Sequence, residues 1–237
     1  MEQANILIVD DDDEIREVVK VLLSSEGYSV AAAGSGGKAL EYLSSDDGPR
    51  TKLVILDIMM PDMDGYETCK KIRGISNVPI LFLTAKSSET DMLKGFMSGG
   101  DDYLQKPFSY TELAVRVKAL IRRYTSYRGM DEEAAVDDMV LTIGDLVIDK
   151  RSMTVRRGRE NIELTNTEFG ILWILAGNRR KVFSIKEIYE NVWNDMYLPT
   201  AANTVMVHIK NLREKLGSGD DKPELIKNRW GKGYYIE

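Results

Sequence analysis

The first 124 residues predict an α/β domain built on a parallel sheet, and the chain beyond residue 138 predicts a second, smaller domain. Short apolar runs alternate with helical patterns five times, which is the order that βα units produce. The apolar runs are nearly continuous, as expected for strands that helices cover on both faces of a sheet. An acidic stretch then ends this alternation. The two parts of the chain therefore predict different folds.

The first βα unit shows both patterns. Ile6–Val9 is a continuous apolar run, and Gly27 ends the helix that follows it. The apolar residues of that helix recur at i, i+3, i+4 and i+7, one helical face: Ile15, Val18, Val19 and Leu22. The other units are strand 28–32 and helix 35–45, strand 53–57 and helix 65–73, strand 79–83 and helix 88–97, and strand 102–105 and helix 109–123.

Residues 125–138 are acidic and poor in large apolar side chains, a composition that favours a linker. Residues 139–237 predict a domain with a different order of elements. Its expected elements are strands 145–148, 152–156 and 161–163, helices 166–177, 185–192 and 200–216, and a hairpin of 225–227 with 234–236. Strands, three helices and a terminal hairpin describe a winged helix-turn-helix unit.

Composition limits the classes of protein that this sequence can encode. No run reaches the about 18 apolar residues of a membrane span, and the N-terminus lacks a basic region followed by an apolar one, so we expect a cytoplasmic protein. The single cysteine, Cys69, excludes an internal disulfide and a cysteine-built metal site, and the single histidine, His208, argues against a histidine-rich one.

Charge is distributed unevenly along the chain. The net charge is −5 over residues 1–124, −4 over 125–138 and +3 over 139–237, which gives the total of −6. A basic C-terminal part is a weak indication of a polyanionic partner, and a merely solvated surface explains it equally well.

Four of the predicted strands end in polar or reactive side chains. The first runs into Asp10–Asp13, the third ends at Asp57, the fourth at Thr84 and the fifth at Lys106. Because ligands of an open parallel sheet bind outside the carboxyl ends of its strands, we expect these groups to converge. Carboxylates suit a hard cation such as Mg²⁺, which takes one or two of them together with phosphate oxygens. The grouping therefore predicts a site for a metal and a phosphoryl group.

Each group has a place in phosphoryl-transfer chemistry. As a nucleophile, Asp57 would accept the phosphoryl group, while the metal and Lys106 offset charge on its oxygens and Thr84 donates a hydrogen bond to them. The residues alone do not select two metal ligands from the four-aspartate run, and Asp12 or Asp13 is also expected to cap the following helix. Each of these residues taken alone has an ordinary structural explanation. Their joint occurrence at separate strand ends favours a role in phosphoryl transfer.

These motifs resemble the receiver domain of two-component response regulators, a flavodoxin-like fold of five βα units. The resemblance covers residues 5–123 and rests on Ile-Leu-Ile-Val-Asp-Asp-Asp, Leu-Asp-Ile-Met-Met-Pro-Asp-Met-Asp-Gly, Leu-Thr-Ala-Lys and Asp-Asp-Tyr-Leu-Gln-Lys-Pro-Phe. It implies that Asp57 is the phosphoacceptor. It also implies that Mg²⁺ (or Mn²⁺) is held by Asp10, Asp11, Asp57 and the backbone carbonyl of Met59.

The same resemblance implies roles for residues around the phosphate. Thr84 would be the switch hydroxyl, Tyr103 an aromatic that changes rotamer, and Lys106 the phosphate-contacting cation before a cis bond to Pro107. In the resembled family, active receivers pair through the face of the fourth helix, fifth strand and fifth helix. The charged residues expected on that dimer face are Asp101, Asp102, Glu112, Arg116, Lys118, Arg122 and Arg123.

The helix predicted at 200–216 has one apolar and one polar face. Its apolar residues, at i, i+4, i+7 and i+11, are expected to face the core: Val205, Ile209, Leu212 and Leu216. The opposite face and its flanks carry Asn203, Val207, His208, Lys210, Asn211 and Arg213. Short polar side chains suit base edges in the major groove, and cations suit phosphates. An amphipathic surface helix without DNA contacts is the alternative.

Three segments resemble the effector domain of the OmpR/PhoB subfamily, over residues 140–237: Leu164–Phe169, Asn203–Arg213 and Trp230–Tyr234. The resemblance implies a recognition helix in the major groove of double-stranded DNA and a hairpin wing near the adjacent minor groove. The residues expected to contact DNA are Asn203, Thr204, Val207, His208, Lys210, Asn211, Arg213, Trp230 and Lys232. His208 is expected either to contact a phosphate or to pack on the helix flank. Asn203, Asn211 and Trp230 stand where other members have arginines, so base preference cannot be transferred.

Together the two domains predict a transcription factor rather than an enzyme. A histidine kinase would phosphorylate Asp57, the receiver would form a homodimer, and two effector domains would bind repeated half-sites, with RNA polymerase as a further partner. One alternative is a Mg²⁺-dependent phosphatase, which would want a second acid where this chain has Met59. The other is a constitutive DNA binder whose receiver is only a dimerisation scaffold, which the intact metal and phosphate residues disfavour.

Overall fold

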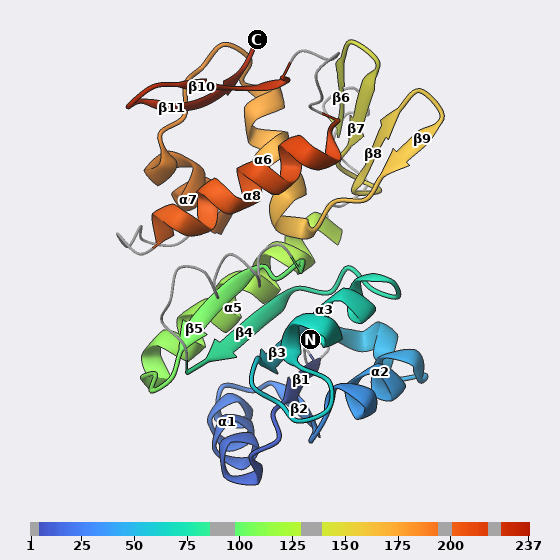
Figure 1. Ribbon diagram of the computed structural model, residues 1–237, viewed down its shortest axis with the longest axis vertical. Coiled ribbons are helices and arrows are strands. Elements are labelled where there is room, and N and C mark those ends of the chain that lie inside the picture. Colours follow the sequence, from blue (N-terminus) through green and yellow to red (C-terminus); the bar gives the residue numbers. More distant parts are fainter. Residues whose placement is uncertain (1–4, 86–97, 129–138, 194–200, 218–223) are drawn as a thin grey trace. The chain divides into compact units, whose positions relative to one another are not determined.

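The computed structural model describes residues 5–85, 98–128, 139–193, 201–217 and 224–237 (Figure 1). The chain divides into two compact units, Met1–Tyr124 and Thr125–Glu237. No described helix is long and apolar enough to cross a membrane. Each unit is described by itself below.

The N-terminal unit contains a five-stranded sheet of the predicted kind. Its strands lie in the order β2-β1-β3-β4-β5, and every neighbouring pair is parallel. The strands are β1 (Asn5–Val9), β2 (Ser29–Ala33), β3 (Thr51–Asp57), β4 (Ile80–Thr84) and β5 (Asp102–Gln105). β2 lies at the edge, and it is the strand whose end carries no reactive side chain. The predicted doubly wound α/β fold is confirmed.

The described α-helices of this unit match the predicted ones closely except at the C-terminal end of the last one, and a short 3-10 helix was not predicted. They are α1 (Asp13–Ser25), α2 (Gly36–Ser44), the short 3-10 helix η1 (Gly48–Arg50), α3 (Gly65–Arg73) and α5 (Tyr110–Arg128). α5 continues through 125–128, which were expected to belong to the linker. The acidic charges that favour a linker begin only at Asp131, so they do not interrupt the helix earlier. The helix expected at 88–97 lies outside the described residues.

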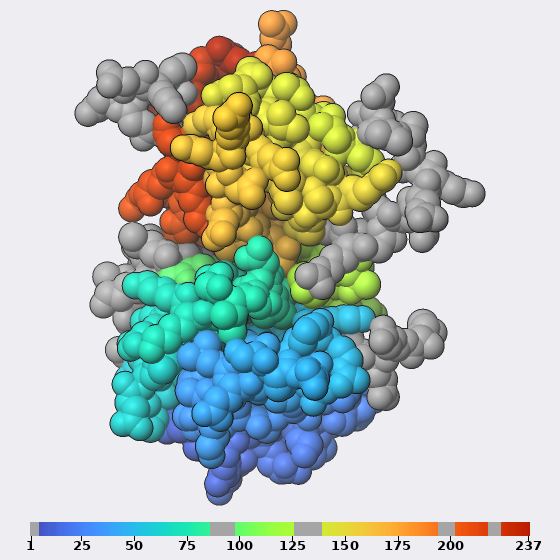
Figure 2. Space-filling model, turned by 90° about the vertical axis from the view of Figure 1, so that its right-hand side faces the viewer, coloured from blue at the N-terminus to red at the C-terminus, as the bar shows by residue number. Residues whose placement is uncertain are grey.

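Helices cover both faces of the sheet because its strands alternate their side chains between the two faces. Ile6 and Ile8 of β1 pack with Val19 of α1 and Val117 of α5 in one core cluster. Leu7, between them, is also fully buried and points to the opposite face. α2 and α3 pack against each other, and they form much of the blue-to-teal surface in Figure 2.

One side chain of the predicted apolar face of α1 is exposed. Val19 is fully buried, but Val18, on the same face, is 55% exposed. Val18 instead lines a recess of about 510 Å³ between α1 and the loop after β5, together with Ile15, Lys106 and Phe108. The spacing predicted the helix correctly, and of the four apolar residues on this face only Val19 is fully buried.

The C-terminal unit combines a four-stranded antiparallel sheet, three helices and a hairpin. The sheet consists of β6 (Val140–Ile143), β7 (Leu146–Asp149), β8 (Thr154–Arg157) and β9 (Glu160–Ile162), paired in that order. The helices are α6 (Asn166–Gly177), α7 (Ile185–Trp193) and α8 (Ala201–Lys215), and the hairpin is formed by β10 (Ile226–Arg229) and β11 (Gly233–Ile236). β6 was not predicted, because its four residues show no clear alternation and become a strand by pairing with β7.

A buried carboxylate fixes α8 against α6. Thr165 caps α6 in a capping box with Glu168, whose side chain is only 1% exposed. Glu168 also accepts a hydrogen bond from the Lys215 ammonium at 2.7 Å. The segment that carried part of the family resemblance, Leu164–Phe169, therefore sets the position of the predicted recognition helix.

Candidate functional site

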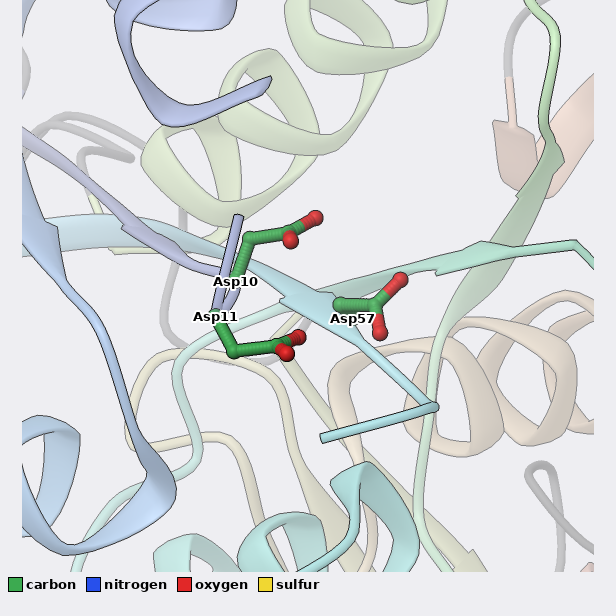
Figure 3. A group of neighbouring side chains, drawn as sticks. All are labelled: Asp10, Asp11 and Asp57. Atoms are coloured by element: carbon green, nitrogen blue, oxygen red, sulfur yellow. The ribbon is translucent and has the colours of Figure 1, made fainter. Parts of the chain in front are cut away.

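Two neighbouring strands deliver the acidic cluster. In the sheet, Val9 of β1 is paired with Leu56 of β3, so Asp10 and Asp57 lie side by side at the ends of their strands. Asp10, Asp11 and Asp57 each offer an oxygen, and these atoms all lie within 4.8 Å of one another. Figure 3 shows the three carboxylates extending to the same side of the strand ends. The convergence expected of parallel strand ends is therefore present in the structure.

Lys106 bridges the two buried members of the cluster. Its Nζ donates to Asp10 Oδ2 at 2.7 Å and to Asp57 Oδ1 at 2.6 Å. Asp10 and Asp57 are only 1% and 4% exposed. Burial raises the pKa of Asp57, and the bonds from Lys106 oppose that rise. Burial lowers the pKa of Lys106, but the two carboxylates outweigh it, so the net pKa of Lys106 is raised. Lys106 therefore stays charged between the two acids.

The four-aspartate run is divided between the site and the following helix. Asp10 Oδ1 accepts the Asp12 N–H at 3.0 Å, which turns the chain out of β1. Asp12 is the N-cap of α1 and accepts from the backbone N–H groups of Glu14 and Ile15. Asp13 pairs with Arg16, whose guanidinium also donates to the Asp10 carbonyl at 2.5 Å. Asp12 therefore caps α1 and Asp13 begins it. The sequence had left open which of the two caps the helix.

The loop after β3 supports Asp57 from its other side. The Met59 N–H donates to Asp57 Oδ2 at 2.6 Å, so the carboxylate is fixed by its own loop. Gly65 at the start of α3 lies so close to β3 that a Cβ there would come within 2.2 Å of the Asp57 carbonyl oxygen. A glycine is therefore required for α3 to begin beside the acid. The Met59 carbonyl as a metal ligand stays a prediction.

Thr84 and Tyr103 lie on the two strands beyond Asp57. Thr84 ends β4 and is 1% exposed, and its carbonyl accepts the Lys106 N–H at 2.7 Å. Tyr103 of β5 is 6% exposed, with its ring 5.1 Å from that of Phe82. The Lys106–Pro107 peptide bond is cis, as the resemblance implied. The chain thus carries the expected groups at all four strand ends, and the switching roles of Thr84 and Tyr103 stay predictions.

One residue of the expected dimer face has partners within the receiver. Asp101 is fully buried, accepts the Ile80 N–H at 2.9 Å and pairs with Arg73 at 2.8 Å. Arg73 also donates to the carbonyls of Val78 and Gly99. The Asp101 carboxylate therefore joins the turn before β4 to the turn before β5, and its place on a dimer face stays a prediction.

The remaining charges of that face differ in exposure. Asp102, 4% exposed, is paired with Arg116 at 2.9 Å, and Arg116 also reaches Glu112 at 3.2 Å. Lys118 and Arg122 are exposed on α5, whereas Arg123 is only 6% exposed. Glu112, Lys118 and Arg122 are therefore the exposed charges among these residues.

α8 buries the predicted apolar face. Val205, Ile209, Leu212 and Leu216 are at most 3% exposed and belong to the core of the C-terminal unit. Of the opposite face, the Lys210 side chain is 57% exposed and lies 3.9 Å from Glu214. Asn203 is half-buried, and Val207 and Asn211 are 5% and 8% exposed. Thr204, a further expected DNA contact, is 8% exposed. DNA contacts by all these residues stay predictions.

Two expected phosphate contacts have structural partners in the C-terminal unit. His208 is 1% exposed, and its ring lies 5.7 Å from that of Trp193, so it takes the packed position that was the alternative. Arg213 donates to the Ile226 carbonyl at 2.8 and 3.0 Å and pairs with Glu224 at 2.9 Å. Arg213 therefore ties α8 to the hairpin, a role that the sequence did not reveal because the partner is a backbone carbonyl.

The hairpin tip presents the remaining predicted contacts. Trp230 is 93% exposed, and Lys232 is exposed beside it. Sequence reasoning overlooked Arg16 and Gly65, which fix the backbone around the acids. The position of Arg16 three residues after Asp13 was the available signal for the first of them.

Comparison with known proteins agrees with this architecture. Residues 6–118 match the response regulator receiver domain family, and residues 158–236 match the family of transcriptional regulatory protein C-terminal domains. The transcriptional regulatory protein YrkP of Bacillus subtilis is 44% identical over 229 residues, 97% of this chain and 96% of its own length. The regulatory protein VanR of Enterococcus faecium is 40% identical over 232 residues, 98% of each chain.

Solved structures give the same result. A mutant of RitR superposes with a TM-score of 0.77 at 26% identity over 98% of both chains. DrrB of Thermotoga maritima, an OmpR/PhoB homologue, gives 0.50 at 32% identity over 99% of both. The chain therefore belongs to the two-component response regulators of the OmpR/PhoB type, in which a receiver domain is joined to a DNA-binding transcriptional regulatory domain.

Proposed function

We propose that Asp57 is the phosphoacceptor through which a partner histidine kinase controls DNA binding by the C-terminal unit. The observation that carries this proposal is the environment of the Asp57 carboxylate. It lies at the end of β3, bonded by Lys106 and the Met59 N–H, and within 4.8 Å of ligand oxygens of Asp10 and Asp11. A buried carboxylate that lies beside a cation and further acids has the surroundings expected of a group that takes part in phosphoryl transfer.

The chain's own groups account for the transfer. An Oδ of Asp57 attacks phosphorus and forms a P–O bond, while the bond from phosphorus to the donor breaks and its electron pair leaves with the donor. For a phosphohistidine donor the broken bond is P–N. The Lys106 ammonium would pair with the new phosphoryl oxygens, and the Thr84 hydroxyl would donate a hydrogen bond to them.

The donor set fits a divalent metal. Three carboxylates that converge, two of them buried, provide the hard oxygen ligands that Mg²⁺ or Mn²⁺ prefers. Asp10, Asp11 and Asp57 would hold the ion, with the Met59 carbonyl as a fourth protein ligand. Its contribution when bound would be to neutralise charge on the phosphoryl oxygens.

Phosphorylation would act on the effector domain by shifting an existing equilibrium. Movement of Thr84 towards the phosphate would change the space available to the neighbouring Tyr103 ring. That change would favour a homodimer formed through Lys118, Arg122 and their neighbours on α5, and two effector domains would then bind repeated half-sites on double-stranded DNA. RNA polymerase would be contacted from the DNA-bound state.

Acetyl phosphate with Mg²⁺ tests the proposal without a kinase. Intact-mass measurement should show the addition of one phosphoryl group to the wild type and none to Asp57→Asn. Asp12→Asn is the matched control, because Asp12 belongs to the same acidic run but caps α1. EDTA should abolish the reaction, and phosphorylation should tighten binding to duplexes selected from random DNA. A phosphorylated Asp57→Asn protein, or DNA affinity that is indifferent to the donor, would contradict the proposal.

A further inference from the structure

Arg16 of α1 bonds the backbone of the acidic cluster. Its Nη1 donates to the Asp10 carbonyl oxygen at 2.5 Å, and its Nη2 pairs with the Asp13 carboxylate. The two contacts are unequal, because the Arg16 side chain is 17% exposed whereas that of Asp13 is 89% exposed. An ion pair with a hydrated acid contributes little to the position of either group. The charge-assisted bond to the Asp10 carbonyl is therefore the stronger constraint.

The bonded carbonyl belongs to the peptide unit that joins Asp10 to Asp11. A peptide unit is planar, so a bond to its oxygen also fixes the direction in which the chain enters Asp11. The Asp10 carboxylate has supports of its own, the Asp12 N–H at 3.0 Å and the Lys106 ammonium at 2.7 Å. Asp11 is exposed, and Figure 3 shows its carboxylate beside that of Asp10. The placement of Asp11 therefore depends on the backbone that Arg16 holds.

The end of β2 leaves room for the Arg16 guanidinium. The residue after β2 is Gly34, where a Cβ would lie 3.4 Å from Arg16 Nη1 and 3.5 Å from its Cζ and Nη2. The Asp10 N–H donates to the Ala33 carbonyl at 3.3 Å, so the ends of β1 and β2 are joined beside this contact. A larger side chain after β2 would compete with Arg16 for its place. The strand end that carries no reactive side chain thus receives a charged group from α1.

We propose that Arg16 is a positioning residue for the divalent metal, because it sets the backbone that presents Asp11 beside Asp10 and Asp57. The inference rests on the proposed function, since it concerns the ion that these three carboxylates would hold. Without the bond from Arg16, the Asp10 carbonyl would be free to turn towards water. Metal binding would then have to restrain this peptide unit, and the entropic cost would lower the affinity for the ion.

The sign of the effect separates positioning from simple electrostatics. Arg16 carries a positive charge near a site for a cation, so its charge alone should weaken metal binding. On that basis Arg16→Ala would bind a metal more tightly than the wild type does. Positioning predicts the opposite result. We expect Arg16→Ala to raise the Kd for Mn²⁺ about tenfold, the loss that is typical when a group that orients metal ligands is removed.

Electron paramagnetic resonance of free Mn²⁺ measures this Kd in the full-length protein without a phosphoryl donor. Arg16→Lys keeps the charge and can donate one bond to the same carbonyl, so it should recover part of the affinity. Asp13→Asn is the matched control, because it removes the exposed partner of Arg16 and leaves the carbonyl bond in place. It should bind Mn²⁺ within about twofold of the wild type, as expected for the loss of an exposed ion pair.

Gly34→Val tests the same contact without a change in charge. Its two Cγ atoms would extend from a Cβ that already touches the Arg16 guanidinium. The guanidinium should then leave the Asp10 carbonyl, and the Kd for Mn²⁺ should rise as it does in Arg16→Ala. Urea denaturation in EDTA shows which variants are folded. If Arg16→Ala does not fold, Gly34→Val and Arg16→Lys decide the question.

Phosphorylation of Asp57 by acetyl phosphate gives a second measurement. Arg16→Ala should raise the Mg²⁺ concentration that gives half of the maximal rate, while the rate at saturating Mg²⁺ stays near that of the wild type. A variant that is only partly folded would show the reverse pattern, a lower maximal rate at an unchanged half-saturating concentration. The two patterns separate a positioning role from a purely structural one.

The outcomes distinguish this inference from the proposed function. If the wild type binds Mn²⁺ and the folded Arg16 and Gly34 variants bind it equally well or more tightly, the inference is overturned and the proposed function stands. Weakening by Asp13→Asn as large as that by Arg16→Ala would also overturn it, because the ion pair would then be the effective contact. If Mn²⁺ binding depends on Arg16 while Asp57 stays unphosphorylated, the proposed function fails and the inference stands. A wild type that binds no Mn²⁺ would overturn both.

Discussion

Lys106 holds together two acids that come from different strands. Its ammonium lies 2.7 Å from Asp10 and 2.6 Å from Asp57, and all three side chains are largely buried. Two buried carboxylates without a cation would repel each other in a region of low dielectric constant. The same residue that is expected to contact a phosphate therefore also stabilises the unphosphorylated site.

Removal of this ammonium should destabilise the receiver in the absence of metal. We expect Lys106→Ala to lower the free energy of unfolding by about 3 kcal/mol in EDTA, because it leaves buried carboxylates unpaired. Mg²⁺ should recover much of the loss by binding the acids. Urea denaturation with and without Mg²⁺ measures both effects, with Lys20→Ala, exposed on α1, as the control. An equal loss of unfolding free energy in Lys106→Ala and Lys20→Ala would show that the bonds from Lys106 to Asp10 and Asp57 do not stabilise the receiver.

Lys210 is the most exposed cation of α8. Its side chain is 57% exposed, and its nearest acid, Glu214, is 3.9 Å away. If it contacts a phosphate, Lys210→Ala should weaken binding to every duplex and flatten the salt dependence of log affinity by about one unit. Lys186→Ala is the matched control, because Lys186 forms a similar 3.8 Å pair with Glu190 on α7. An unchanged slope in Lys210→Ala would remove it from the phosphate contacts.

At the scale of elements, α8 and the hairpin, which are the elements predicted to contact DNA, are linked by side chains. Arg213 of α8 bonds the Ile226 carbonyl and pairs with Glu224, and its guanidinium lies 5.5 Å from the centre of the Tyr234 ring. Two residues further along α8, Lys215 is bonded to Glu168 of α6. Arg213 and Lys215 therefore hold the predicted recognition helix in place relative to the predicted wing and to α6.

Arg213→Ala tests whether this link matters. We expect the DNA-free protein to lose about 1–3 kcal/mol of stability, because the Ile226 carbonyl loses charge-assisted hydrogen bonds. DNA affinity should fall with little change in salt slope, since the wing is displaced but no phosphate contact is lost. Denaturation of the DNA-free protein and salt titration of binding measure the two. Unchanged stability with a flatter slope would instead restore the phosphate role first expected of Arg213.

At the scale of the whole molecule, phosphorylation is expected to change the association state. Acetyl phosphate with Mg²⁺ should convert monomer to dimer in sedimentation experiments, and Asp57→Asn should stay monomeric under the same conditions. Lys118→Glu should weaken the dimer at least about tenfold by placing like charges opposite one another. Lys20→Glu on α1 is its control. An equally stable dimer without a phosphoryl donor would show that phosphorylation does not control assembly.

Most of the architecture follows from local patterns. Strand and helix periods predicted the parallel sheet, the three effector helices and the hairpin, because each pattern depends on residues close together in the chain. The strand that was not predicted, β6, exists through its pairing with β7. Val18 shows the same limit, since spacing identifies a helix better than it identifies which edge of the apolar face is buried.

The sequence by itself determined which chemical groups the protein has and that parallel strands bring Asp10, Asp57, Thr84 and Lys106 to one edge. Only the tertiary structure decided how charged and aromatic residues are used. It buried Asp101 beside Arg73, turned Arg213 to a backbone carbonyl and left Trp230 in water. The physical reason is that periodicity encodes which residues share a face, whereas the partner of a long side chain depends on contacts between segments distant in sequence.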